Sequence, residues 1–257
     1  MFTRVLKYKD LLLVFIWREF IIRYRQSVIG VLWAILQPLS MMGLFVLVFG
    51  IILKTTHSQY PYVLFFLAGI LPWTFFAGAT NFAVHSLAGN YNLITKIYFP
   101  REIIPLSGVA INFIDYIIGF VVYFIFLIWY RVPLTWNFFW IFPLVILLLF
   151  FTTAFGYLLA AVNVYYRDVK LASNFIIQLL FFATPVIYSV EHVENRLKIV
   201  LFLNPLTFII ENMRRVTIEG RGVVLWQFCI EATLVAAIYM MVYSIFTRVE
   251  RAFADVI

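Results

Sequence analysis

The chain alternates long apolar stretches with short segments that carry most of its charge. A helix needs about 20 consecutive apolar residues to cross a bilayer, and six stretches meet this requirement. They are residues 31–53, 62–84, 103–128, 138–164, 171–190 and 223–247. Charged side chains are costly at bilayer depth, and only Asp115 and Glu231 lie well inside these stretches. The pattern predicts an all-α integral membrane protein with six transmembrane helices.

The composition excludes a water-soluble domain. Hydrophobic residues make up 65% of the 257 residues and the mean hydropathy is +1.00, whereas soluble domains are about half apolar. The net charge of +7 forms no single basic patch, because Lys and Arg stand at span ends beside Trp and Tyr. We therefore expect no nucleic acid partner. Cys229 is the single cysteine, which excludes an intrachain disulfide and a thiolate metal site.

The distribution of Lys and Arg predicts the topology. An even number of spans puts both termini on one side of the membrane. The N-terminal segment and the connections on its side hold twelve Lys and Arg, against seven on the other side. Because positively charged loops stay inside, we expect a multi-pass protein of the plasma membrane with both termini in the cytoplasm. Residues 223–257 then form the sixth helix and a cytoplasmic tail.

Residues 1–30 predict an amphipathic helix in the plane of the cytoplasmic interface. Arg18 and Arg25 lie largely opposite its apolar face, and Glu19 and Arg23 have the spacing of a favourable i,i+4 ion pair. The apolar face consists of Leu13, Trp17, Phe20, Ile21, Tyr24 and Val28. The alternative is that this helix does no more than anchor the first span, which would need the same composition.

The second cytoplasmic connection, residues 87–105, predicts a short helix at about 89–100. Asn90 or Asn92 can cap it, and an exposed apolar ridge follows before the next span begins. The ridge consists of Leu93, Ile94, Ile97 and Tyr98. Such a ridge suits insertion into a groove on a partner protein. The alternative is that it rests on lipid.

The last loop, residues 191–222, predicts an external hairpin of two short helices. Asn204 and Pro205 are a good helix start, and Gly220 marks a stop. Between them, five apolar residues follow helical spacing opposite Glu211, Arg214 and Arg215. The five are Leu206, Ile209, Ile210, Met213 and Val216. This pattern is too polar to cross lipid and suits a helix at the membrane surface. An ordinary solvated loop is the alternative.

No catalytic constellation is visible in the sequence. His57, His85 and His192 are scattered, and no zinc-protease motif, paired carboxylates, nucleophile motif or phosphate-binding GxxxxGK[ST] loop is present. We therefore expect no catalytic residue, metal or cofactor in this chain. Any ATP that drives it must be hydrolysed by another protein.

The two acidic residues inside the spans have two interpretations. Intramembrane acids often mark a substrate path or a proton relay. Alternatively, Asp115 and Glu231 face neighbouring helices and hydrogen bond to Gln37, Asn112 or Gln178, which lie at plausible depth. The 29 Phe, 15 Tyr and 7 Trp leave a similar choice between a path for sugar rings, whose C–H faces pack on aromatic planes, and contact with lipid.

Several short motifs follow one another along most of the chain. They are RYRQS at 23–27, GVLW at 30–33, QPL at 37–39, KIYFPRE at 96–102, NVYYRD at 163–168, TPVIY at 184–188, and NPLT at 204–207 leading to Glu211 and Arg214. As an ordered set they resemble the membrane subunit of type-2 ABC exporters. The resemblance is to the polysaccharide or O-antigen export permeases (Wzm-type), which have relatives in teichoic acid and capsule export.

The resemblance implies a homodimer of six-span subunits joined to two cytoplasmic ABC ATPase subunits in a bacterial inner membrane. ATP and Mg would be bound by the ATPase subunits, and the cargo would be a lipid-linked polysaccharide. The N-terminal helix would be the interface helix, with Trp17, Arg18, Glu19, Arg23 and Arg25 as its candidate residues.

The resemblance also implies roles for two other elements. The coupling helix would dock on the ATPase through Leu93, Ile94, Lys96, Ile97, Tyr98 and Arg101. The hairpin would form an external gate with Pro185, Tyr188, Asn204, Pro205, Glu211, Arg214 and Arg215. The alternatives are export of a smaller lipid, teichoic acid or drug by the same architecture, or a membrane-embedded glycosyl- or acyltransferase.

Overall fold

The computed structural model describes residues 6–25, 28–52, 60–97, 99–166, 168–250 and 253, and in these ranges the regular structure is entirely helical. Five helical segments are long and apolar enough to span a membrane: Gly30–Ile52, Tyr62–Gly89, Ile103–Trp129, Trp136–Tyr165 and Leu225–Val249. The first comprises a short 3-10 turn, α3 (Trp33–Phe45) and a π-helical end (Val46–Ile52). Five of the six predicted spans are therefore found close to their expected bounds.

The fifth predicted span, 171–190, is wrong at its C-terminal end. The helix here, α8 (Val169–Ala183), ends seven residues early. The residue that precedes a proline is disfavoured in the helical region, and Thr184 before Pro185 is extended, with φ −103° and ψ 135°. Pro185 thus follows the helix instead of lying within it. At 15 residues, α8 is shorter than the five spans.

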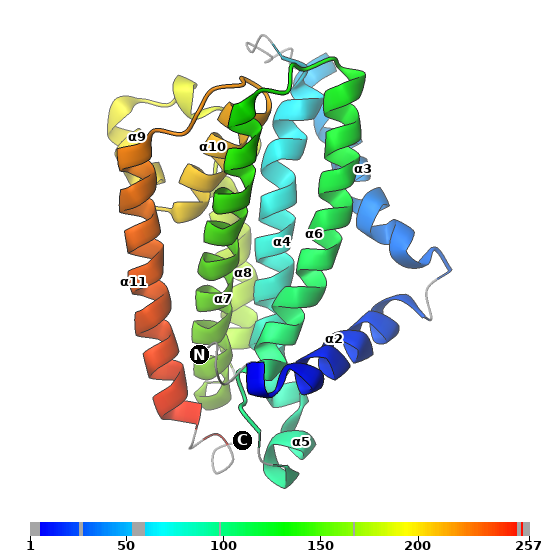
Figure 1. Ribbon diagram of the computed structural model, residues 1–257, viewed down its shortest axis with the longest axis vertical. Helices are drawn as coiled ribbons and strands as arrows, with labels where there is room; N and C mark the ends of the chain where they lie inside the picture. Colours follow the sequence, from blue (N-terminus) through cyan, green and yellow to red (C-terminus); the bar gives the residue numbers. More distant parts are fainter. Residues whose placement is uncertain are drawn as a thin grey trace.

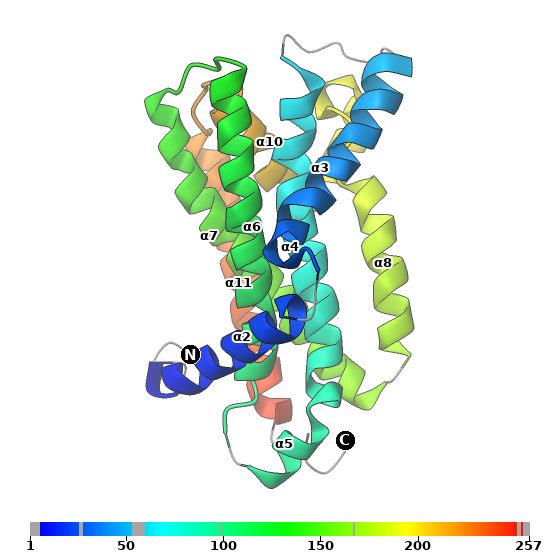
Figure 2. The same ribbon diagram turned by 90° about the vertical axis from the view of Figure 1, so that its right-hand side faces the viewer.

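The bundle is built around α4 (Tyr62–Gly89), the most buried of the long helices. It contacts α3, α6 (Ile103–Trp129), α7 (Ile141–Tyr165) and α8, and α11 (Leu225–Val249) packs on the outside of α7 (Figure 1). Ring contacts pair Trp140 with Phe228 and Phe150 with Tyr239, so α7 and α11 run in the same direction. Figure 2 shows α3 and α8 on the side of α4 that α7 and α11 leave free.

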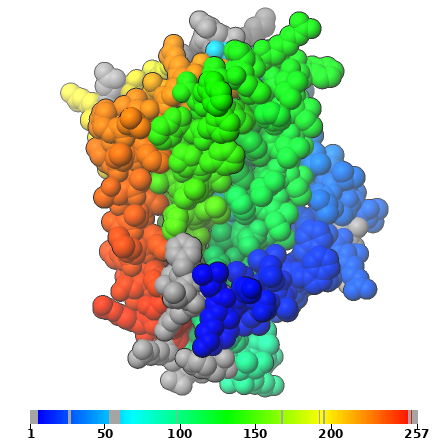
Figure 3. Space-filling view, in the orientation of Figure 1, coloured from blue at the N-terminus to red at the C-terminus, as the bar shows by residue number. Residues whose placement is uncertain are grey.

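The shorter helices lie at the two ends of the bundle. At one end, α2 (Lys9–Tyr24) crosses the base of α6 and α5 (Tyr91–Lys96) projects below, near the end of α11 (Figures 1 and 3). At the other end lie α9 (Asn195–Phe202) and α10 (Pro205–Thr217). We call these the α5 end and the α9 end. Helices therefore lie within each of the three segments where the sequence predicts shorter helices, residues 1–30, 89–100 and 191–222.

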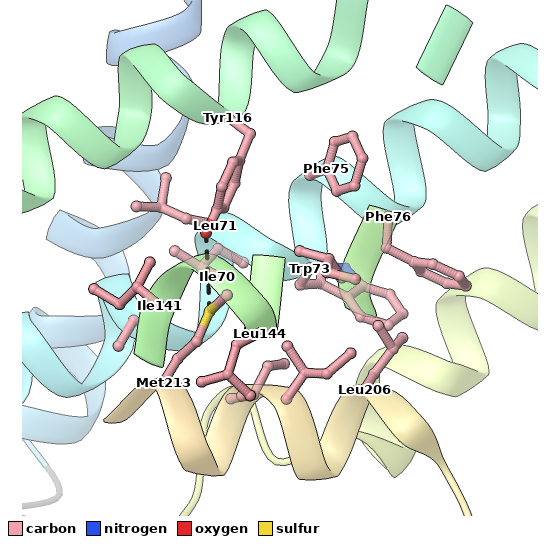
Figure 4. Close-up of a cluster of buried hydrophobic side chains, with 14 of the residues drawn as sticks. Ile70, Leu71, Trp73, Phe75, Phe76, Tyr116, Ile141, Leu144, Leu206 and Met213 are labelled. Carbon is pink, nitrogen blue, oxygen red and sulfur yellow. Dashed lines mark hydrogen bonds between the residues drawn. The ribbon is translucent and has the colours of Figure 1, made fainter. Parts of the chain in front are cut away.

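Two clusters of buried apolar side chains hold the helices together. The larger cluster joins α4, α6, α7 and α10, and Figure 4 shows α10 contributing Leu206 and Met213 to it beneath the aromatic side chains of α4. The smaller cluster lies at the α5 end and includes Phe15 of α2, Ile94 of α5 and Phe246 of α11. Helices long enough to span a membrane associate mainly through van der Waals packing of such side chains and through hydrogen bonds between helices. Each end of the bundle therefore has its own packing centre.

Candidate functional site

The exposed surface of α5 differs from the ridge that the sequence predicts. Ile94 is 3% exposed and packs into the smaller cluster with Phe15 and Phe99, whereas Ile97 is 57% exposed. Leu93 is half-buried against that cluster, and Tyr98 lies outside the described residues. The prediction that Ile94 belongs to an exposed ridge is wrong. A six-residue helix stays packed on the bundle only if at least one of its apolar side chains faces inward, and in α5 this side chain is Ile94. The surface left for a partner is Tyr91, Asn92, Thr95, Lys96 and Ile97.

Asn90 stands at the start of α5, as predicted, but its side chain does not cap the helix. Its Nδ2 donates to the carbonyl oxygen of Ser86 at 2.8 Å, and its Oδ1 accepts from Nη1 of Arg18 at 3.0 Å. Arg18 also lies 4.7 Å from the centre of the Phe15 ring. This arginine therefore ties α2 to the turn between α4 and α5. Sequence spacing gave no signal for this contact, which joins residues 72 positions apart.

Arg101 does not belong to the exposed docking surface either. Its guanidinium donates to the main-chain carbonyl oxygen of Glu250, directly after the last turn of α11. A cation near the C-terminal end of a helix can bind its last carbonyl groups and interacts favourably with the helix dipole. Arg101 thus joins the segment after α5 to the end of α11.

The predicted interface helix turns part of its apolar face away from the bundle. Leu13 and Trp17 are exposed, whereas Phe15 and Tyr24 are buried. Arg25 is exposed. The predicted ion pair of Glu19 with Arg23 is wrong. Glu19 instead pairs with its neighbour Arg18 at 2.6 Å, and Arg23 is drawn to another helix.

Asp115 of α6 is the residue that attracts Arg23. The Arg23 guanidinium and the Tyr24 hydroxyl both donate to its carboxylate, and Asn112 Oδ1 lies 3.4 Å from both terminal nitrogens of Arg23. Burial and the nearby carboxylate raise the pKa of Tyr24 to about 12, so its hydroxyl stays protonated and donates. Of the predicted neighbours, Asn112 is close, but the direct partners of Asp115 come from α2. Asp115 therefore fixes α2 to α6.

Glu231 of α11 has a different environment. The residue is 9% exposed, and its Oε2 atom is buried without a hydrogen bond to any described group. The hydrogen bonds expected from Gln37, Asn112 or Gln178 are not observed for this atom. Its neighbour along the chain, Phe228, contacts Trp140 of α7. Glu231 therefore lies near the α7 side of α11 without the pairing that Asp115 has.

Of the two hairpin helices, α10 lies much deeper in the bundle than a surface helix, whereas α9 is largely exposed. Asn204 caps α10 through its Oδ1, which accepts from the Leu206 amide at 3.1 Å, and Pro205 occupies the first turn, as predicted. Gly220 has φ +66°, a conformation that glycine adopts without strain, and it follows the end of the helix, also as predicted. However, α10 packs against α4 and α7, and Arg214 of its predicted polar face is buried instead of facing water or headgroups, whereas Glu211 and Arg215 are partly exposed.

Arg214 of α10 is buried at the centre of this end, with 3% of its surface exposed. Its guanidinium donates to the carbonyl oxygens of Pro185 at 2.6 Å, Val186 at 2.7 Å and Phe65 at 3.2 Å. The guanidinium carbon lies 3.6 Å from the centre of the Phe65 ring. Arg214 thereby connects α10, the segment after α8 and α4. The sequence placed Arg214 on a solvent face, because charge alone gives no sign of a buried carbonyl cluster.

Other predicted gate residues gather around Arg214. Glu211 accepts from Arg214 at 2.8 Å, and Asn204 Nδ2 donates to the Thr184 hydroxyl at 2.9 Å. Burial raises the pKa of the Glu211 carboxyl, and the charge of Arg214 opposes part of this shift. Tyr188 lies in the same segment as Pro185, and its carbonyl oxygen is 3.5 Å from Arg214 Nη1. Arg215 is half-buried beside this group.

Sequence reasoning missed two residues that complete this arrangement. The Tyr62 hydroxyl donates to the carbonyl oxygen of Ile187 at 3.0 Å. A Cβ atom on Gly69 would lie 2.6 Å from Arg214 Nη2 and 3.0 Å from the carbonyl oxygen of Val186. Gly69 is therefore a point on α4 that the segment after α8 approaches too closely for a side chain to fit. Among the described residues, no group of three His, Cys, Asp or Glu side chains is placed to hold a metal ion.

Comparison with known proteins agrees with this architecture. An O-antigen export system permease protein, RfbA, from Myxococcus xanthus is 31% identical over 218 residues, which cover 84% of this chain and 83% of that protein. A protein of the same name from Klebsiella pneumoniae is 27% identical over 253 residues, 96% of this chain and 95% of that protein. The polysialic acid transport protein KpsM of Escherichia coli is 21% identical over 217 residues, 79% of each chain.

The match to a family profile covers most of the elements described above. Residues 10–218 correspond to the family described as ABC-2 type transporter. This range includes α2, α5, the Asp115 pair and the whole of α10, and it leaves out α11. With more than half of its length inside the profile, the chain belongs to the ABC-2 type transporter family.

Proposed function

We propose that this chain is the permease subunit of an ABC exporter that moves a lipid-linked polysaccharide, similar to an O-antigen, across the bacterial inner membrane. The observation that carries the proposal is the similarity along 96% of the chain to an O-antigen export permease. The absence of a phosphate-binding motif from the sequence supports a subunit that receives its energy from elsewhere. ATP and Mg then belong to two separate cytoplasmic ATPase subunits.

In this proposal α8 also crosses the membrane, which raises the number of crossings from five to six. A helix of 15 residues rises about 22 Å, short of the roughly 30 Å of hydrocarbon, so the non-helical residues 184–189 must cover the remaining distance. Six crossings put both termini on one side. α2, α5 and the end of α11 share one end of the bundle (Figure 1), and the excess of Lys and Arg assigns that end to the cytoplasm.

The contacts at the α5 end support a mechanism for receiving motion from the ATPases. Tyr91, Lys96 and Ile97 would bind in a groove of the ATPase, as short amphipathic helices do. A displacement of α5 is passed to α2 through Arg18 and Asn90, and to α11 through Arg101. ATP binding in the partner dimer then shifts the balance between closed and open arrangements of the helices.

A second copy of the chain completes the path in this proposal. α3 and α8 leave many apolar side chains exposed on the side of α4 that the other long helices do not cover (Figure 2). Leu36, Leu44, Phe175 and Leu179 are examples. A homodimer that closes over this side leaves the polysaccharide between the two subunits, where aromatic planes pack against sugar rings.

The test is reconstitution of the permease with its ATPase. A purified complex should contain two permease and two ATPase subunits, and vesicles that hold it should move lipid-linked polysaccharide only when ATP is present. Glycan movement by the permease alone in nucleotide-free vesicles would contradict the proposal. ATP hydrolysis that responds to hydrophobic drugs but not to the glycan would indicate a smaller cargo instead.

A further inference from the structure

The segment that follows α8 is not helical, so its main-chain carbonyl groups need hydrogen-bond partners from other parts of the fold. Arg214 supplies several of them. A non-helical segment at membrane depth is tolerated only if protein or water satisfies its carbonyl groups. The segment Thr184–Tyr188 has four carbonyl groups in a row with partners from elsewhere in the fold. Arg214 takes those of Pro185 and Val186 and approaches that of Tyr188, and Tyr62 takes that of Ile187. The Arg214 guanidinium therefore contacts three of these four carbonyl groups.

Stability alone does not explain the choice of an arginine at this position. Removing a guanidinium from water is costly, and apolar side chains of similar volume often stabilise such a site better. The one carboxylate that pairs with Arg214, Glu211, lies on the same helix and does not join α10 to another element. The hydrogen bonds that join Arg214 to other elements are all to main-chain carbonyls, and its ring contact with Phe65 adds to the attachment to α4. α10 also packs on α4 through the larger apolar cluster, so the arginine is not needed merely to keep these two helices in contact.

The contacts of Arg214 fall into two groups. Pro185 and Val186 belong to the segment that leads into the hairpin, so these bonds hold segment 184–188 and α10 together as one unit. Phe65 belongs to α4, and the bond to its carbonyl and the contact with its ring hold that unit against α4. The absence of a side chain on Gly69 is what lets the two groups of contacts form at the same place.

We propose that Arg214 is a positioning residue that latches segment 184–188 and α10, as one unit, onto α4 at Phe65 and Gly69, and that export opens the path by separating this unit from α4. The inference rests on the proposed function and assigns the closing contact of its gate. It predicts that Val186, fully buried beneath this contact, becomes accessible when the latch opens.

The experiment uses the permease–ATPase complex in lipid nanodiscs with a single cysteine reporter. Cys229, the one natural cysteine, is replaced by alanine and Val186→Cys is introduced, and the rate of labelling by a membrane-impermeant maleimide is measured with and without ATP. Gly69→Ala inserts a methyl group between α4 and the latch without changing charge. Gly43→Ala is its matched control, because a Cβ there meets nothing within 4 Å.

A weakened latch should open more often. Loss of one hydrogen bond to a charged group corresponds to about a tenfold rise in the open population, so Gly69→Ala should label about ten times faster without nucleotide. Arg214→Lys, which keeps the charge but loses the planar fork, should behave similarly, and Arg215→Lys should not. In the parent complex ATP should raise the labelling rate. In Gly69→Ala less glycan should be exported per ATP hydrolysed.

Two results would overturn the inference. The first is unchanged nucleotide-free labelling in Gly69→Ala. The second is a labelling rate of the parent complex that ATP does not change. The contact of Arg214 with α4 would then stay closed throughout the cycle and have only a structural role. If Arg214→Lys does not fold, the labelling rate of Gly69→Ala still tests the inference. A parent complex that exports no glycan would contradict the proposed function by itself, while the comparison of Gly69→Ala with Gly43→Ala would still test the seat of Arg214 on α4.

Discussion

The ion pair between Arg23 and Asp115 should stabilise the attachment of α2 to the bundle. The side chains are 33% and 24% exposed, so the pair is neither a surface salt bridge nor a fully buried one. Exposed pairs contribute about 0–1 kcal/mol, and breaking a buried pair costs about 3–5 kcal/mol. With partial screening by solvent, we expect Asp115→Asn or Arg23→Gln to lower the free energy of unfolding by about 2 kcal/mol each.

A double-mutant cycle separates this interaction from the other effects of each change. Because either single substitution already breaks the pair, the double variant should lose less than the sum of the two, with a coupling energy of about 1–2 kcal/mol. Arg25→Gln is the matched control, since Arg25 lies on the same helix with its side chain exposed. It should change stability by less than about 0.5 kcal/mol.

The assay is equilibrium unfolding of the detergent-solubilised chain, with proteolysis near α2 as a local measure. The single variants should expose α2 to protease before the rest of the chain unfolds. Strict additivity of the two substitutions would show that Arg23 and Asp115 do not interact, and the reasoning would then be refuted. The same result would follow if Arg25→Gln proved as costly as Arg23→Gln.

Three further predictions, which use five substitutions, test the other sites. Ile97→Asp, at an exposed position, should abolish copurification of the ATPase and leave folding intact. Ile94→Asp, at a buried position, should instead destabilise the chain by about 3–5 kcal/mol. If the two variants behaved alike in binding and unfolding assays, the revised docking surface would be refuted. Asn204→Ala should cost about 1 kcal/mol through loss of the helix cap, and Asn204→Asp should retain most of the stability; indistinguishable melting of the two would argue against the cap. Glu231→Met should leave export unchanged and raise stability by about 1 kcal/mol, because it removes a buried oxygen without a described partner; a loss of export would instead put Glu231 on the cargo path.

Local features of the chain were predictable because they depend on nearby residues. The long helices follow from the lengths of apolar runs, and the start of α10 follows from Asn204 and Pro205, whose cap involves residues two positions apart. Gly220 after α10 is of the same kind. The early end of α8 was also within reach, since the restriction that Pro185 places on Thr184 is local. Apolar composition outweighed that signal, and the predicted span was too long.

The contacts that the charged side chains make could not be predicted from the sequence. Arg23 had a favourable partner four residues away in Glu19, yet it pairs with Asp115, 92 positions along the chain. A partly buried carboxylate has less water around it than a fully exposed one, so it attracts a nearby cation more strongly. That difference in environment exists only after α2 has packed on α6.

The sequence by itself determined that this protein is a helical membrane protein with three amphipathic elements, because the free energy of placing residues in lipid depends on composition and spacing alone. Only the tertiary structure decided which way those elements face. Ile94 turns inward and Arg214 lies buried, since the carbonyl groups left free after α8 and the space above Gly69 are produced by segments far apart in the sequence. A buried arginine becomes favourable only where such groups converge.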